Sequence, residues 1–187
     1  MKWVAFFSQT GQEIAHISKL LGIKPDLIVR DGPIKPGEVC EDILKFNCQK
    51  IEVNKVDSSF YHKTFDNYNY NKDVVITLHG WLKIVPKDVC EKYEIYNGHP
   101  GDVIGYPILK GKDPQKKAFD LKLPTSGVII HRVTSDVDGG PIFYHKNGVD
   151  IKDLSLDEVY KTLKSASLMS WHWFFNSRLS YIKSNIK

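Results

Sequence analysis

The sequence is poor in cysteine and has no apolar run of membrane length. Its three cysteines, Cys40, Cys48 and Cys90, form no CxxC pair, and their odd number argues against a disulfide framework. No apolar stretch approaches the ~20 residues of a membrane helix. The apolar run at residues 3–7 is too short for the core of a signal peptide. We therefore expect a protein of the reducing cytoplasm.

Metal-binding spacings are also missing from the sequence. None of the seven histidines stands in an HxxxH or HxH pair, so no metal site is expected. Repeats, low-complexity segments and linker-like stretches are absent, and 187 residues amount to about one domain. We expect a single domain over residues 1–187.

The net charge of +4 is unevenly distributed along the chain. Residues 110–122 hold five lysines against two aspartates. Such a bias would attract an anionic small molecule, although lysines on solvated helix faces are the more ordinary explanation. Because no RNA-binding signature is present, nucleic acid is not expected as a partner.

In the first half of the chain, the hydrophobic pattern alternates strands with helices. Residues 3–7 are apolar on both faces, which is typical of a central parallel strand. Ile14, Ile17, Leu20 and Leu21 share one face of a helix that Gly22 would end. The expected strands are 3–7, 27–29, 51–53 and 74–78, and the expected helices are 11–22, 38–46 and 87–92; residues 58–70 are ambiguous.

The pattern then changes to strands joined by loops, at residues 94–97, 128–133 and 142–144. Asn147-Gly148 predicts a type I′ hairpin turn that returns through residues 149–151. Ser155 and Glu158 form a capping box that would open a long helix. The residues expected on its inner side are Val159, Leu163, Ala166, Met169 and Trp173, and the aromatic run at 171–175 is expected in the core or in a homodimer contact.

This order of elements predicts an α/β fold. We expect one Rossmann-type domain whose twisted sheet is parallel first and mixed after residue 97, with helices flanking it. Ligands of such folds bind beyond the carboxyl ends of the strands.

Polar side chains gather where two of these strands end. Asn97 and His99 stand in the run NGHPG at residues 97–101, and Asp138 stands in DVDGGP at residues 136–141. An amide, an imidazole and a carboxylate at one sheet edge would suit acyl transfer, with an oxyanion donor, a proton carrier and its orienting group. The alternative is that these loop residues make only turns and caps.

These two motifs, in this order, resemble the catalytic signature of the folate-dependent formyltransferases. Residues 78–85 are similar to the segment of that family that wraps the folate pterin, and residues 125–133 to the strand before its catalytic aspartate. The resemblance is closest over residues 73–144 and extends to residues 1–21. It covers the glycinamide ribonucleotide transformylases and the sugar N-formyltransferases.

The resemblance implies a formyltransferase-like fold and a role for each matching residue. Asn97 would hold the formyl oxygen, His99 would act as the acid/base group, and Asp138 would be its partner. His131 matches a family histidine that is either structural or substrate-facing. The co-substrate would be 10-formyltetrahydrofolate, with no metal, bound by Leu82, Lys83, Ile84, Val85, Val137, Gly139 and Gly140.

Two departures from the family pattern bear on the acceptor amine. Thr10, Gly11, Gln12 and Glu13 stand where the transformylases bind a substrate phosphate, and we expect Thr10 and Glu13 to form a capping box there, with Glu13 disfavouring phosphate. The stretch from Lys110 to residue 118 is similar to a segment of sugar-amine and methionyl-tRNA formyltransferases.

A nucleotide-linked amino sugar or another small amine is therefore the expected acceptor. Glycinamide ribonucleotide is the alternative acceptor, and hydrolysis of the donor would use the same residues. A folate- or nucleotide-binding module that has lost catalysis is a hypothesis of another class.

Overall fold

The computed structural model describes residues 1–70 and 73–184. The chain divides into two compact units. The first comprises Met1–Tyr96 with Ser177–Lys187, and the second comprises Asn97–Asn176. This division does not decide the expectation of a single domain, which stays a prediction.

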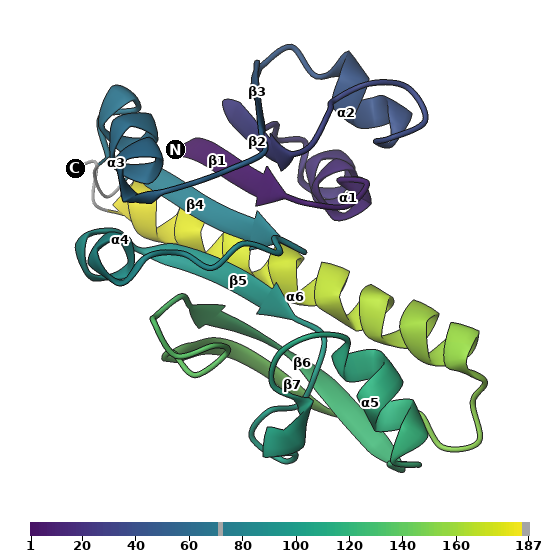
Figure 1. Ribbon diagram of the computed structural model, residues 1–187. Coiled ribbons are helices and arrows are strands. Elements are labelled where there is room, and N and C mark those ends of the chain that lie inside the picture. The colour runs from purple at the N-terminus through teal and green to yellow at the C-terminus, as the bar shows by residue number, and fades with distance from the viewer. Residues whose placement is uncertain (71–72, 185–187) are drawn as a thin grey trace. The chain divides into compact units, whose positions relative to one another are not determined.

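The first unit is built on parallel strands, as the sequence predicts. In it, β1 (Lys2–Phe7) pairs with β2 (Leu27–Asp31) on one side and with β4 (Val74–His79) on the other, and β3 (Gln49–Val53) follows β2 (Figure 1). After Lys2 every residue of β1 is buried, and so is every residue of β4. Continuous burial of both faces explains why these strands read as apolar runs.

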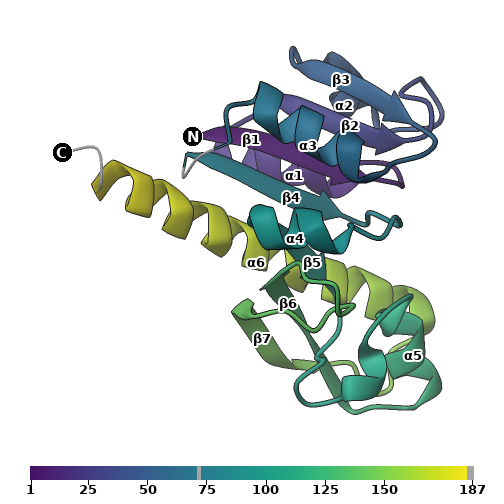
Figure 2. The ribbon, with the colours of Figure 1, turned by 60° about the vertical axis from the view of Figure 1, so that its left-hand side comes forward.

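Four helices accompany these strands: α1 (Gln12–Leu21), α2 (Glu41–Lys45), α3 (Ser58–Asn67) and α4 (Lys87–Lys92). Helices α1 and α3 lie on opposite faces of the strands β1 and β4 (Figure 2). The ambiguous stretch is thus a helix, and it packs Tyr61 and Phe65 against Phe6 of β1. Of the residues expected to share one face of α1, Ile14 and Ile17 are buried, whereas Leu20 is 53% exposed.

Strand β5 (Ile95–His99) begins in the first unit and ends in the second. The second unit continues with the 3₁₀ helix η1 (Pro107–Leu109), α5 (Pro114–Asp120), β6 (Thr125–Arg132) and β7 (Ile142–Asp150). Strands β6 and β7 are antiparallel. Parallel strands followed by an antiparallel pair confirm the predicted α/β class with a mixed arrangement.

The predicted hairpin at Asn147-Gly148 is wrong. Both residues lie inside β7, where the pairing with β6 shifts register between Ser126 and Val128. A Cβ on the intervening Gly127 would lie 2.2 Å from the carbonyl oxygen of Lys146, so the two backbones approach there more closely than any other residue allows. The Asn-Gly pair therefore makes a bulge in a continuous strand.

The long helix α6 (Leu156–Ser184) begins as predicted. The backbone N–H and hydroxyl of Ser155 both donate to the Glu158 carboxylate, and the Glu158 N–H lies 3.4 Å from the Ser155 hydroxyl. Val159 and Leu163 are buried as expected. The prediction for Met169 and Trp173 is wrong: they are 62% and 46% exposed, because Trp171 and Phe174 continue the buried stripe at the helical repeat.

No helix among the described residues is long and apolar enough to cross a membrane.

Candidate active site

Asn97 and His99 come from the end of β5. Alternation along a strand places these two side chains on the same face, with Gly98 between them on the other. A Cβ on Gly98 would lie 2.7 Å from the indole nitrogen of Trp171, so the α6 side chain packs directly on the strand backbone. Glycine at this position lets β5 lie close to α6 while its other face carries the functional groups.

Asp138 comes from the turn that follows β6. Its own φ is +49°, so the strained residue of this turn is the aspartate rather than a glycine. The glycines are needed for space: a Cβ on Gly140 would lie 1.9 Å from the Arg132 carbonyl oxygen, and one on Gly139 would lie 1.8 Å from the Asp136 carboxylate. A turn this tight fixes the Asp138 carboxylate in one direction.

The structure brings the three expected catalytic residues together within the second unit. His99 Nδ1 lies 3.2 Å from Asp138 Oδ2, and Asn97 Nδ2 lies 3.4 Å from Asp138 Oδ1. His131 joins them, with its Nε2 at 3.2 Å from both Asp138 Oδ1 and Asn97 Nδ2. His99, Asp138 and His131 are buried.

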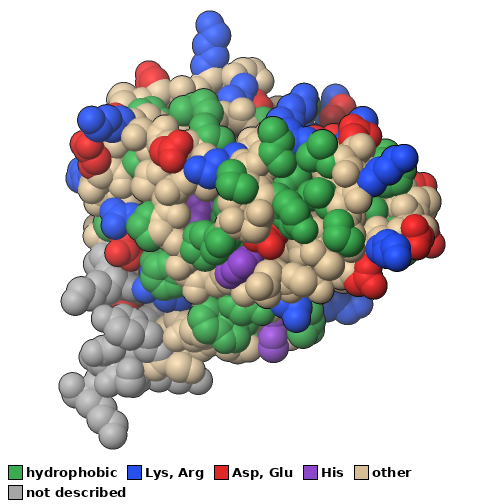
Figure 3. All heavy atoms as spheres, turned by 90° about the horizontal axis from the view of Figure 1, so that it is seen from below, with side chains coloured by type: hydrophobic (Ala, Val, Ile, Leu, Met, Phe, Trp, Pro, Cys, Tyr) green, Lys and Arg blue, Asp and Glu red, His purple; other side chains and the backbone are tan. Residues whose placement is uncertain are grey.

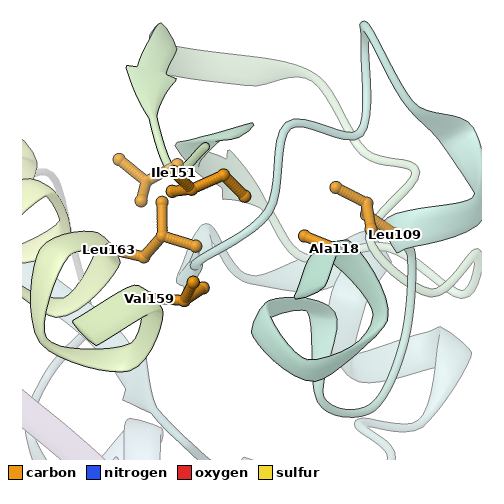
Figure 4. Packing of buried hydrophobic residues seen from close by; sticks show 6 residues of the cluster. Leu109, Ala118, Ile151, Val159 and Leu163 are labelled. Carbon is orange, nitrogen blue, oxygen red and sulfur yellow. The ribbon is translucent and has the colours of Figure 1, made fainter. Parts of the chain in front are cut away.

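Backbone groups of one loop hold the His99–Asp138 pair from the other side. The Leu109 carbonyl oxygen accepts from His99 Nε2 at 2.9 Å, and the Gly111 N–H donates to Asp138 Oδ2 at 2.8 Å. The Leu109 side chain is fully buried in an apolar cluster with residues of α5, β6 and α6 (Figure 4). Packing of that side chain fixes the carbonyl that orients the His99 imidazole.

The two members of the pair have pKa values shifted by their surroundings. Burial lowers the pKa of His99, which outweighs the opposing effects of the Asp138 charge and the Leu109 carbonyl. Burial raises the pKa of Asp138, but the contact with His131, the charge of His99 and the Gly111 N–H together lower it. The site thus favours an ionised carboxylate beside an imidazole that resists protonation.

The residues expected to bind folate lie on two loops. In the first unit, Leu82 and Ile84 are exposed and Val85 is buried, while Lys83 pairs with Asp31 at 3.2 Å. In the second unit, Val137 is half-exposed beside the tight turn described above. Hydrophobic side chains also gather on one exposed face of the molecule (Figure 3).

The expected capping box at Thr10 is wrong. The N-cap of α1 is Gly11, whose φ is +72°, and a Cβ on it would lie 2.9 Å from Ile43. The Glu13 carboxylate lies 2.8 Å from His79 Nδ1 at the end of β4. A buried histidine competes for this carboxylate, and the sequence pattern cannot show that competition.

The lysines expected to attract an anion already have partners on the protein. Lys110 Nζ lies 3.7 Å from the Asp136 carboxylate, and Lys116 pairs with Asp120 on α5. Lys117 donates to the Lys110 carbonyl. The two ion pairs of Lys110 and Lys116 are exposed, so a bound anion could replace them at low cost.

Sequence reasoning missed the Leu109 carbonyl and the Gly111 N–H. Backbone groups carry no residue signature, so nothing in the sequence could single them out. Among residues 1–70 and 73–184, no three or more His, Cys, Asp or Glu side chains are arranged so that they could hold a metal ion.

Comparison with known proteins shows the family of this chain. The formyl transferase family model matches residues 7–170, so the chain belongs to that family. The resemblance drawn from the two motifs is thereby confirmed. The comparison with curated protein sequences gives no match.

Solved structures similar to this chain share its fold. Phosphoribosylglycinamide formyltransferase from Bacillus halodurans has a TM-score of 0.75 and 20% identity, over 93% of this chain and 95% of its own. The enzyme of that name from Streptococcus pneumoniae TIGR4 has a TM-score of 0.76 and 20% identity, over 94% and 97%. A formyltetrahydrofolate deformylase from Pseudomonas putida KT2440 has a TM-score of 0.70 and 14% identity, over 91% of this chain and 62% of its own.

Proposed function

We propose that this chain transfers the formyl group of 10-formyltetrahydrofolate to the primary amine of a small acceptor. The observation that carries the proposal is the cluster of Asn97, His99 and Asp138 on the two motifs of the family. The cluster combines an oxyanion donor with a buried proton-carrying pair, which is what formyl transfer to an amine requires.

The proposed reaction has two steps. The amine nitrogen attacks the formyl carbon, and the carbonyl electron pair moves onto the formyl oxygen, where the Asn97 amide donates a hydrogen bond. The proton lost by the amine passes to the His99–Asp138 pair. The tetrahedral intermediate then collapses, the bond to N10 of the folate breaks, and the pair returns a proton to that nitrogen.

Donor binding is proposed for the residues that match the family's folate segments. Leu82 and Ile84 offer exposed apolar surface, and Lys83 a cation, in the loop after β4. Val137 and the glycine turn around Asp138 offer backbone groups in the second unit. The residues proposed to bind donor are Leu82, Lys83, Ile84, Val85, Val137, Gly139 and Gly140.

Glycinamide ribonucleotide is the acceptor we propose first. Similar solved structures with near-complete mutual coverage carry that activity in their names, which favours it over the sugar amine expected from the sequence. The sequence argument against a phosphate at α1 assumed a capping box of Thr10 and Glu13, and that box does not form. A nucleotide-linked amino sugar is the second candidate, because of the segment that begins at Lys110.

The test is a transfer assay with the purified chain and 10-formyltetrahydrofolate. Glycinamide ribonucleotide, a nucleotide-linked amino sugar and no acceptor are compared, with tetrahydrofolate release and the formylated product measured separately. Matched release and product with one acceptor would support transfer. Equal release without acceptor would indicate hydrolysis instead, and no release in any arm would leave a binding module.

A further inference from the structure

Two imidazoles bracket the Asp138 carboxylate. His99 Nδ1 faces one carboxylate oxygen and His131 Nε2 faces the other, each at 3.2 Å. The outer nitrogens are held in the same way: His99 Nε2 lies 2.9 Å from the Leu109 carbonyl oxygen, and His131 Nδ1 lies 3.0 Å from that of Arg132. The arrangement is nearly symmetric about the carboxylate.

The outer contacts determine which nitrogen carries hydrogen. A carbonyl oxygen only accepts, so each ring carries a hydrogen on its outer nitrogen. The inner nitrogen of a neutral ring then turns a lone pair toward Asp138, and only a further proton makes that contact a hydrogen bond. The two rings therefore compete for the charge of a single carboxylate.

His131 is placed to influence Asn97 as well. Its Nε2 lies 3.2 Å from Asn97 Nδ2, and the Asp138 oxygen on the same side can only accept, so one N–H of the Asn97 amide points toward these two groups and the other remains for the formyl oxygen. The β6 pairing shifts register between Ile130 and His131, which aims this side chain at the site. Only 3% of the His131 side chain is exposed, and its Nε2 faces the two groups that it would orient.

We propose that His131 is a positioning residue for the formyl transfer: it orients Asn97 and Asp138, and by competing with His99 for the single Asp138 charge it keeps His99 unprotonated and ready to accept a proton. The expected change in kcat rests on the proposed function. The expected change in the pKa of His99 does not. The Coulomb effect of His131 lowers the pKa of His99, in agreement with this role.

The charged groups that face His99 come from three places. Asp138 lies in the turn after β6, His131 in β6 itself, and Lys117 in α5. Asp138 raises the pKa of His99, whereas His131 and Lys117 lower it. Loss of His131 leaves Asp138 to pair with His99 alone, so His99 should hold its proton to higher pH.

The test compares His131→Gln with the wild-type chain and with His145→Gln as a matched control. His145 is also a histidine of the second unit beside a buried carboxylate, that of Asp102, at 2.9 Å. Histidine NMR titration without ligands should move the His99 midpoint to higher pH in His131→Gln only. An unmoved midpoint would overturn the proposal.

Kinetics give a second readout. In His131→Gln, kcat should fall about 10- to 100-fold, as for other residues that orient a catalytic group, with KM for the donor little changed and the acidic limb of kcat moved to higher pH. A KM effect alone, or an unshifted limb, would contradict the positioning role.

A third measurement needs no variant. Nitrogen shifts of the wild-type chain should show hydrogen on Nδ1 of His131 and on Nε2 of His99, and the opposite tautomers would overturn the proposal even if His131→Gln fails to fold. Both NMR results stand whether or not any acceptor is formylated, so failure of the proposed function is seen separately.

Discussion

Two strands of this protein end in a buried histidine beside a carboxylate. In the first unit, β4 ends at His79, whose Nδ1 lies 2.8 Å from the Glu13 carboxylate. In the second unit, β5 ends at His99, whose Nδ1 lies 3.2 Å from that of Asp138. The side chains of both histidines are more than nine-tenths buried, so burial and the presence of a carboxylate do not distinguish the pairs.

What differs is the partner of the second ring nitrogen. His79 Nε2 lies 2.8 Å from the Thr77 hydroxyl, which also accepts from the Trp3 indole N–H at 2.7 Å. A hydroxyl can donate as well as accept, so Trp3, Thr77 and a neutral His79 can each donate to the next group and end at Glu13. The His99 partner is a carbonyl, which cannot donate.

A neutral His79 is thus satisfied on both sides, whereas a neutral His99 turns a lone pair toward an acceptor. The first arrangement suits a structural link between α1, β1 and β4. In the second, a proton on His99 Nδ1 would complete the contact with Asp138, while burial lowers the pKa of His99 and so opposes that proton. Such an opposition is what a general base needs, because it must take a proton and give it back.

The largest effect is expected from His99→Ala. Removal of the proton carrier should lower kcat by about 10²–10⁴-fold, while donor binding measured by fluorescence or calorimetry persists. The matched control is His79→Gln, which should keep kcat within a few-fold. Equal losses in the two variants would abolish the distinction between the pairs.

The next effect concerns the first unit. Thr77→Val removes the hydroxyl that both Trp3 and His79 contact, and leaves buried polar groups without that partner. We expect a loss of about 1–3 kcal/mol in unfolding free energy, measured by urea denaturation, with kcat unchanged. Unchanged stability would mean that the chain of hydrogen bonds is not a structural link.

The sequence predicted the buried strands and singled out Asn97, His99 and Asp138, because both leave local signals. Apolar runs mark β1 and β4, and polar motifs mark the end of β5, with Asn97 and His99, and the turn after β6, with Asp138. It could not predict the groups that decide the chemistry of the pair. The Leu109 carbonyl depends on the packing of a cluster of residues that are distant in the sequence. The sequence named His131, but the direction of its side chain depends on a register shift in β6.

The two predicted capping boxes show the same limit. Ser155 and Glu158 are exposed residues with few competing partners, and their local pattern decides the start of α6. Thr10 and Glu13 carry the same pattern, but Gly11 adopts a left-handed conformation and His79 binds the carboxylate. A local motif predicts structure only where tertiary contacts do not offer its groups another partner.

The third prediction tests this limit. Ser155→Ala removes the N-cap of α6 and should cost ~1 kcal/mol in unfolding free energy. Thr10→Ala, the same kind of change at the box that did not form, should stay within about 0.5 kcal/mol, because Thr10 is exposed and its backbone carbonyl keeps the hydrogen bond from the Cys40 N–H. Thermal or urea unfolding of both variants measures the difference, and equal costs would contradict it.

The smallest effect is expected from Glu13→Gln. The amide oxygen of Gln can still accept from His79 Nδ1, so stability should change little, but the negative charge in the first turn of α1 is lost. If an acceptor phosphate binds near this turn, its KM should fall about two- to five-fold, the size expected for one charge at a helix N-terminus. The KM of glycinamide ribonucleotide is measured against that of the folate donor, which serves as the internal control because the charge change should leave it unmoved.

An unchanged acceptor KM would mean that the phosphate is bound elsewhere, and the lysines around Lys110 would then be the next positions to substitute. A rise in the acceptor KM would mean instead that the Glu13 carboxylate accepts hydrogen bonds from the acceptor.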